Sequence, residues 1–295
     1  MFFENCGEAG AEYINTRDED NYSSNKPFIE QLWSIYKPYA DKHFKKEAKL
    51  HFHERFWEMY LGATLIKRGY SLEPTPQCQG PEFYIDMGSR RMWFEAIAPG
   101  RGEGNDAVPE SPLGQVAEPP QREILLRLTH AIREKHRKYN LYKQDGIIKD
   151  DDLYIVAVNG SGICPRLYGV KIPFIVQSLY PAGDFAITLD SSTIQNVDSY
   201  YQYRDKIAKI NGSIVSTDNF INNEYCGISA VIYSYADPWI WTDESKLGSE
   251  FIIIHNVKAT NQLQRGFFSF GLEYWAEEQE NEIQLHQKDW NVENS

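Results

Sequence analysis

Two short segments, Glu82-Phe-Tyr-Ile-Asp86 and Arg91-Met-Trp-Phe-Glu-Ala-Ile-Ala98, decide the expected fold of this chain. Each is a short run of aromatic and aliphatic residues of the kind that forms a β-strand. Between them lies Met87-Gly-Ser-Arg90, a tight-turn sequence. The two segments and the turn together predict an antiparallel β-hairpin.

The hairpin predicts its own register. With Gly88 and Ser89 at the centre of the turn, two favourable pairs lie opposite one another, Asp86 with Arg91 and Tyr84 with Trp93. The same register places Glu82 opposite Glu95, on the same face of the hairpin. Like charges directly opposite one another destabilise a sheet. The glutamate pair therefore points to a divalent cation between the carboxylates, since Mg²⁺ prefers oxygen ligands. The alternatives are that Glu82 lies in water at a strand end or that the register is shifted by one residue.

Helical patterns flank the hairpin. Apolar side chains recur at helical spacing from Ala48 to Lys67, and Gly69 follows as a C-terminal stop. A short extended segment at 70–73 precedes the hairpin, and a second long helix is predicted from Gln121 to Tyr142. The apolar run 153–158 predicts a buried strand. The expected order from 48 to 158 is helix, three strands, helix, strand.

Three regions are expected along the chain. Residues 1–26 are acidic and polar and are predicted to form a flexible tail. Residues 27–160 hold a helical lead-in and the core just described. Residues 161–295 are expected to form a mixed, strand-rich extension packed on that core, with strand-like runs at 227–234 and 250–255.

Composition excludes several classes of protein. Hydrophobic residues make up 42% of the 295 residues, which excludes a disordered or collagen-like chain. No uncharged apolar run approaches the length of about 18 residues that a membrane helix needs. The start lacks the pattern of a signal peptide. Four scattered cysteines suggest neither a disulfide scaffold nor a zinc cluster. A cytoplasmic protein without a membrane partner is expected.

The formal charge of −12 is unevenly distributed. Residues 27–147 carry 18 basic and 16 acidic side chains, whereas residues 148–295 carry 10 basic and 20 acidic ones. An acidic protein repels nucleic acid at long range, so contacts with phosphate must come from a local basic surface. The middle third is the region that offers one.

The element order, with Gly80-Pro-Glu82 opening the second strand and Phe94-Glu-Ala-Ile-Ala98 on the third, resembles the PD-(D/E)xK nuclease superfamily over about residues 50–158. The resemblance implies an α/β fold with an αβββαβ restriction-endonuclease-like core, followed here by a mostly β C-terminal extension. It implies hydrolysis of phosphodiester bonds in nucleic acid with Mg²⁺ or Mn²⁺, in restriction, repair or defence.

The resemblance also implies roles for individual residues. Glu82 matches the first acid and Glu95 the second, and both are expected to bind the metal ion. Glu58 matches the acid that several families of the superfamily carry on the first helix, and Glu54, one turn earlier, is the second choice. Two departures stand out: Glu82 replaces the usual aspartate, and Ile97 occupies the place of the motif lysine.

Without that lysine, either another cation enters the site or the site is inactive. Arg101, Arg122 and Arg127 are candidates by position, and Arg127 is favoured as the catalytic cation because its helix should pack beside the hairpin. The same helix carries seven basic and two acidic residues from 122 to 143. This surface is either a solvated helix face or a nucleic-acid contact, with candidates Arg122, Arg133, Arg137 and Lys138.

The leading hypothesis is a metal-dependent nuclease, and the alternative is a nuclease-fold binding or scaffold protein that has lost catalysis. Nucleic acid is the expected partner, DNA ahead of RNA, and a homodimer is compatible with either reading. Residues 273–293 carry seven acidic side chains and one basic one. This segment is expected either to lie away from the Glu82/Glu95 face or to cover the basic helix as a cap.

Overall fold

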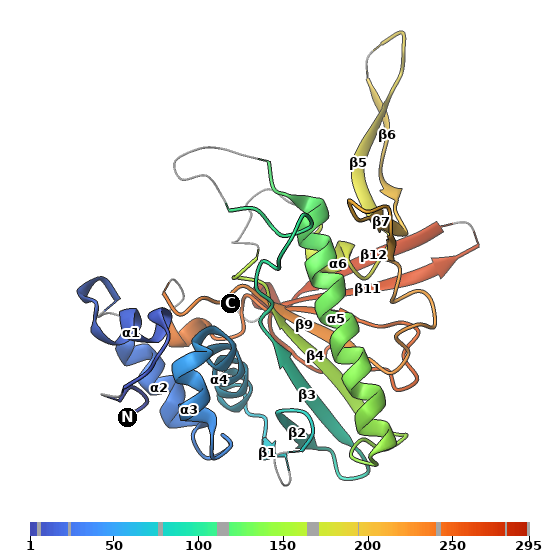
Figure 1. Ribbon diagram of the computed structural model, residues 1–295. Coiled ribbons are helices and arrows are strands. Elements are labelled where there is room, and N and C mark those ends of the chain that lie inside the picture. The colour runs from blue at the N-terminus through green and yellow to red at the C-terminus, as the bar shows by residue number, and fades with distance from the viewer. Residues whose placement is uncertain are drawn as a thin grey trace.

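The computed structural model describes the chain except for residues 5–6, 23–24, 76–78, 111–117, 164–170, 194, 240–242, 281 and 294–295. At its centre lies a mixed eight-stranded sheet with the strand order β1-β2-β3-β4-β9-β10-β11-β12 (Figure 1). The strands are β1 Glu73–Pro74, β2 Phe83–Asp86, β3 Arg91–Ile97, β4 Leu153–Asn159, β9 Ala230–Ser234, β10 Ile252–His255, β11 Leu272–Gln279 and β12 Glu282–Asp289.

The helices of the N-terminal half are α1 Ala11–Asp18, α2 Lys26–Tyr36, α3 Phe44–Leu50, α4 Phe52–Lys67 and α5 Gln121–Gln144. The expected α/β class is confirmed, and the predicted order of helix, three strands, helix and strand is present from α4 to β4. β1, β2 and β3 are antiparallel neighbours, whereas β3 pairs with β4 in parallel. The helix predicted from Ala48 is divided in two at His51, whose backbone leaves the helical region.

The sheet separates two hydrophobic cores, because successive side chains of a strand point to opposite faces. Phe94 and Ala96 of β3 pack with helices α1–α4, whereas Trp93 packs with α5. Figure 1 shows α5 crossing one face of the sheet and the group α1–α4 on the other side. Among the described residues, no helix is long and apolar enough to span a membrane.

The chain start corrects the expectation of a flexible tail. Phe2 and Phe3 are buried, with exposed fractions of 1% and 5%, and Tyr13 of α1 is buried beside them. The backbone N–H groups of Phe2 and Phe3 donate to the Glu30 carboxylate of α2, at 2.7 and 3.1 Å. Two adjacent aromatic side chains offset the ordering cost of an otherwise polar segment.

The C-terminal half is strand-rich, as expected, but much of it completes the central sheet. β9 to β12 continue the sheet beyond β4, with a short helix α6 Phe174–Gln177 before them and α7 Trp290–Glu293 after them. Two further hairpins stand outside the sheet: β5 Ala182–Leu189 with β6 Asn196–Tyr203, and β7 Lys206–Ala208 with β8 Ile214–Ser216. Figure 1 shows β5 and β6 projecting from the body as an arm.

The acidic segment 273–293 forms β11, β12 and α7, at the edge of the sheet opposite to β1. Four strands, β3, β4, β9 and β10, separate β11 from β2. The segment is therefore part of the sheet and lies away from the Glu82/Glu95 hairpin. This position matches the first of the two expected placements and contradicts the cap over the basic helix.

Candidate active site

The hairpin has the predicted register. Tyr84 pairs with Trp93 and Asp86 with Arg91 in the antiparallel ladder of β2 and β3. The turn is closed by the N–H of Met87, which donates to the Arg90 carbonyl at 3.0 Å, and Gly88 takes the positive φ of 83° that such turns require. Just before β2, the N–H of Glu82 donates to the Phe94 carbonyl at 2.9 Å. Glu82 therefore lies one residue beyond the paired ladder, which ends at Phe83 and Phe94, and the charge of Glu95 acts on its carboxyl group.

The Glu95 carboxylate is buried, with an exposed fraction of 1%, and three groups of α5 donate to it. Lys135 Nζ lies 2.6 Å and Lys138 Nζ 2.8 Å from Oε1, and the Tyr142 hydroxyl lies 3.1 Å from Oε2. These residues are three and four positions apart, so they share one face of the helix. Cations from α5 thus approach the acidic cluster, in which Ile97 occupies the place expected for a lysine.

Lys135 is the residue that sequence reasoning missed. It continues the buried row of α5 after Leu128 and Ile132, and its own exposed fraction is 7%. A lysine in the apolar row of a helix must find an acidic partner, because an unpaired buried charge is very costly. The position of Lys135 in this apolar row is the sequence feature from which its buried ion pair could have been predicted. Lys138, expected to contact nucleic acid, shares the carboxylate but remains half exposed, at 49%.

Glu58 of α4 is the second buried carboxylate of the site. The Tyr36 hydroxyl donates to its Oε1 at 2.7 Å and Arg55 Nη1 to its Oε2 at 2.5 Å. Burial raises the pKa of Glu58, and the Arg55 charge partly offsets this increase. Glu54 has an exposed side chain, at 60%, paired with His51 at 3.7 Å. Of the two helix acids, Glu58 is therefore the one held in the interior.

Glu82 lies between these two groups. Among the described residues no hydrogen bond reaches its carboxylate, which lines a cavity of about 400 Å³ together with Glu58, Lys135 and Lys138. Burial raises the pKa of Glu82 well above its usual value, and the charges of Glu58 and Glu95 raise it further. An unpaired carboxyl group next to two buried carboxylates is a strained electrostatic arrangement.

The cavity holds nearly balanced charges. Three carboxylates, Glu54, Glu58 and Glu82, line it together with three cations, Arg55, Lys135 and Lys138. Glu95 is paired with the two lysines and is not part of the lining. No three potential metal ligands of the His, Cys, Asp or Glu type gather closely enough, in the part of the chain that the structure describes, to form a ready-made metal cluster. The donor set nonetheless fits an ion such as Mg²⁺, which takes one or two carboxylates and keeps several waters.

The arginines expected from the sequence lie elsewhere. Arg127, favoured as the replacement cation, donates from Nε to the Gly100 carbonyl at 2.8 Å and lines a different cavity. Arg122 pairs with Asp106 and Glu123, at 3.0 and 2.5 Å. The prediction for Arg127 is therefore wrong. Arg127 lies about two turns before Lys135 on α5, too far along the helix to reach Glu95.

Among the described residues, the remaining candidates do not line the cavity around Glu82. Arg101 has a buried Nη1 without a hydrogen-bond partner among the described residues. Arg133 contacts His130 at 3.0 Å. Arg137 is exposed, at 75%, and pairs with Glu134 at 3.2 Å. None of these side chains is among those that donate to Glu95.

A serine and a histidine meet near the end of β4 without forming a nucleophilic pair. His53 Nε2 lies 3.2 Å from Ser161 Oγ, and this hydroxyl donates to Asn159 Oδ1 at 2.7 Å. The hydroxyl proton therefore points to the amide oxygen, and the imidazole is not placed to remove it. Residues 161–163 form a turn soon after β4.

Comparisons with known proteins add no relative to this description. The chain matches no family model, no curated protein and no solved structure. The chemistry of the cavity is thus the basis for any statement about function.

Proposed function

We propose that the protein is a metal-dependent nuclease-like hydrolase that cleaves phosphodiester bonds of nucleic acid at the cavity around Glu82. The observation that carries the proposal is the Glu82 carboxyl group, which has no hydrogen bond among the described residues and lies between two buried carboxylates. A divalent cation resolves this arrangement, because it neutralises the charges and fills the free lone pairs.

The topology supports a restriction-endonuclease-like core. The meander β1-β2-β3 with β4 parallel to β3, joined by α5, is the arrangement that the sequence resemblance implies. Support comes from the position of the two acids, since Glu82 directly precedes β2 and Glu95 lies on β3. In this proposal Lys135 takes the role of the lysine that Ile97 replaces.

Each residue then has a defined task. Glu82 and Glu95 would hold Mg²⁺ or Mn²⁺, with Glu58 as a further ligand directly or through water. The ion, when bound, supplies polarisation of the phosphate and a lower pKa for a water molecule. The ammonium group of Lys135, fixed by its contact with Glu95, stabilises the negative charge that develops on the phosphate.

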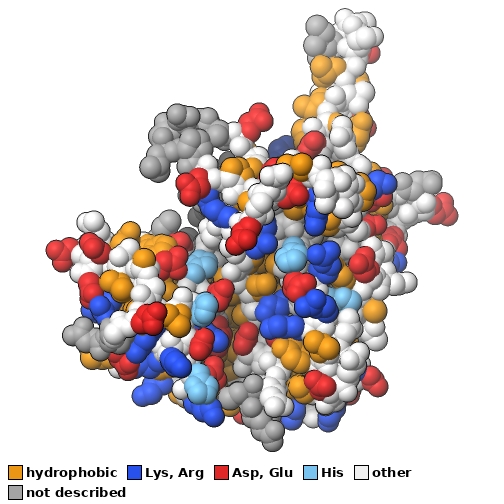
Figure 2. Space-filling view, viewed as in Figure 1, with side chains coloured by type: hydrophobic (Ala, Val, Ile, Leu, Met, Phe, Trp, Pro, Cys, Tyr) orange, Lys and Arg blue, Asp and Glu red, His pale blue; other side chains and the backbone are white. Residues whose placement is uncertain are grey.

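The exposed side of α5 supplies the contacts to the polyanion. Lys138 and Arg137 are exposed there, and Figure 2 shows basic side chains gathered over this helix. Phosphate contacts of this kind position the nucleic acid without reading its sequence. DNA is the first substrate to test and RNA the second.

The test is cleavage of labelled single- and double-stranded DNA and RNA by the full chain, across a titration with Mg²⁺ or Mn²⁺. Glu82→Gln and Lys135→Gln should each lower the rate by about 10² or more, the loss typical of removing a preorganised electrostatic group. Glu54→Gln is the matched control: it removes an exposed acid from the same rim, and its rate should stay within about twofold of wild type.

Two results would contradict the proposal: no metal-dependent cleavage of any substrate, or an equal loss in Glu54→Gln. Because Lys135 is buried, the melting temperature of each variant is measured alongside the rate. Lys138→Gln, which removes a half-exposed cation of the same cluster, provides a variant that is expected to fold normally.

A second candidate is a nuclease-fold binding protein without catalysis. The observation that favours it is that Glu95 already accepts three hydrogen bonds from α5, which leaves it fewer free lone pairs for a metal ion. This candidate predicts nucleic-acid binding that is unchanged by a chelator and is never followed by cleavage.

A further inference from the structure

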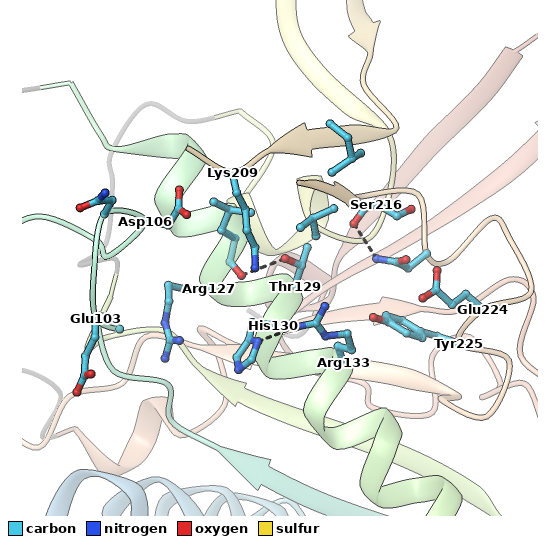
Figure 3. A pocket seen from close by; sticks show the side chains of 16 residues that line it. Glu103, Asp106, Arg127, Thr129, His130, Arg133, Lys209, Ser216, Glu224 and Tyr225 are labelled. Carbon is cyan, nitrogen blue, oxygen red and sulfur yellow. Dashed lines mark hydrogen bonds between the residues drawn. The ribbon is translucent and has the colours of Figure 1, made fainter. Parts of the chain in front are cut away.

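A second cavity lies beside α5 on a different face of the helix, and its basic side chains form no ion pair with any described residue. Arg127 and Arg133 of α5 and Lys209, which follows β7, line a groove of about 470 Å³. Among the described residues none of the three forms an ion pair, although most other arginines and several lysines of the chain do. Figure 3 shows Lys209 approaching α5 from the opposite wall.

The groove is built on fixed elements. Arg127 Nε is held by the Gly100 carbonyl at 2.8 Å. Gly102, with a φ of +84°, packs so closely that a Cβ atom there would lie 3.0 Å from Arg127 Cδ. Lys209 follows β7, and its own N–H and carbonyl close the turn to β8 through bonds with Ser213 and Gly212. The backbone on both walls is therefore held in place before any ligand binds.

The cations are close enough to influence one another. Arg133 lies 3.0 Å from His130 Nδ1, which accepts this hydrogen bond as a neutral ring. The pKa of His130 is lowered, first by burial, then by Arg133 and Arg127, with a smaller contribution from Lys209. Burial also lowers the pKa of Arg127. Positive charge is thus concentrated at this wall of α5.

The nearby carboxylates do not cancel it. Asp106 is already engaged by Arg122 at 3.0 Å and by the N–H of Ile210 at 3.0 Å. Glu103 and Glu224 also line the groove, but in the described part of the chain neither pairs with a groove cation. In Figure 3 the Glu103 side chain points away from Arg127.

We propose that this groove is a phosphate-binding site, which takes a phosphoryl group of a nucleic-acid backbone or of a free nucleotide. Arginine presents several donors in a planar fork that matches phosphate oxygens, and Lys209 adds a mobile ammonium donor. The volume lies in the range of pockets for molecules the size of a nucleotide.

The groove is separate from the carboxylate cavity. With 100° of rotation for each residue, the row Arg127, His130 and Arg133 faces a direction roughly 100° away from Lys135, Lys138 and Tyr142 on the same helix. Its centre lies about 12 Å closer to the N-terminus of α5. The phosphate site therefore stands independently of the proposed hydrolysis.

The first experiment is a calorimetric titration of the full chain with inorganic pyrophosphate, in a chelator and at constant ionic strength. Wild type should give a saturable isotherm, and Arg133→Gln combined with Lys209→Gln should weaken binding by about tenfold or more, because hydrogen bonds to charged groups are the strong ones. Arg265→Gln combined with Lys246→Gln is the matched control, since it removes one arginine and one lysine from exposed positions outside the groove.

Absence of saturable pyrophosphate binding by wild type would overturn the proposal, as would an equal loss in the control variant Arg265→Gln with Lys246→Gln. Lys209→Gln alone is the safeguard against misfolding, because Lys209 lies on a turn outside the central sheet. Since no metal or cleavage is involved, Glu82→Gln should bind pyrophosphate like wild type, even if the proposed hydrolysis fails.

A competition experiment separates the two sources of phosphate. If the groove holds a nucleic-acid backbone, pyrophosphate displaces a fluorescent oligonucleotide and the double variant binds that oligonucleotide more weakly. If it holds a free nucleotide, ATP binds in the presence of saturating oligonucleotide and only ATP binding is lost in the double variant. Displacement of neither probe by pyrophosphate would contradict a phosphate site.

Discussion

Glu82 carries a carboxyl group whose pKa is raised well above its usual value near 4.5, first by burial and then by Glu58 and Glu95. A raised pKa means that the folded chain holds the proton more tightly than the unfolded chain does. Stability is therefore lost as the pH rises from the unfolded value toward the folded one, because a buried acid must ionise. A cation bound as proposed would offset this cost, because it favours the ionised carboxylate.

The variant Glu82→Gln should remove that pH dependence. In urea unfolding without divalent ions, it should match wild type near pH 4.5 and become the more stable protein as the pH increases. Addition of Mg²⁺ should then stabilise wild type and not the variant. Glu54→Gln, at an exposed position, should show neither effect. A Glu82→Gln variant that loses stability relative to wild type with increasing pH would contradict this reading.

The residues of the site differ in how far the sequence predicts them. The pairing of β2 with β3 follows from the two-residue period of a strand and from the turn at Gly88, and the structure has that register from Phe83 to Asp86. Glu82 lies just outside this ladder, with its N–H on the Phe94 carbonyl. Lys135 was not predicted, because a count of the charges on α5 does not distinguish a buried lysine from the exposed basic residues of the same helix. Its position depends on which face of α5 meets the sheet, and that is a tertiary property.

At the scale of elements, long periodic segments were predictable and irregular ones were not. α5 and β4 begin where their apolar patterns begin, at Gln121 and Leu153. The division of the first helix at His51 has no such signal, because side chains on both sides of the break are buried. β5 to β8 were not assigned either, because many of their residues are exposed and lack the alternation of a half-buried strand.

The arm formed by β5 and β6 makes the clearest prediction for an element. Phe185, Ile187 and Leu189 lie on one face of it, with exposed fractions of 43%, 54% and 52%. Figure 2 shows apolar side chains along the projecting arm. Side chains that remain in water contribute little to folding, and exposed apolar patches promote association.

Replacement of residues 187–199 by an Asn-Gly turn should therefore leave the melting temperature within about 2 °C of wild type, since surface changes cost little. The solubility of the shortened protein should increase. For comparison, Tyr274 of β11 is buried, with an exposed fraction of 2%, and Tyr274→Ala should lower the melting temperature clearly. A large loss of stability on shortening the arm would show that its apolar face packs on the body.

At the scale of the whole molecule, the chain start is linked to the candidate site through one aromatic cluster. The Phe2 ring lies 5.6 Å from Trp33 and 6.5 Å from Phe44, measured between centroids. The Phe44 ring centroid in turn lies 5.5 Å from that of Tyr36, and the Arg55 guanidinium lies 5.6 Å from the centroid of the Phe44 ring. Tyr36 and Arg55 are the two donors that hold Glu58.

Phe2→Ala should consequently destabilise the protein by about 3 kcal/mol or more, the usual cost of removing a buried phenylalanine side chain. Ile14→Ala in the same segment is the control, because Ile14 is 36% exposed and its loss should cost under about 1 kcal/mol. Both values come from urea unfolding at neutral pH. Equal effects of the two substitutions would mean that the N-terminal segment does not belong to the core. A selective effect of Phe2→Ala would place residues 1–4 in the same folding unit as the helices that hold Glu58, because their rings share one packed cluster.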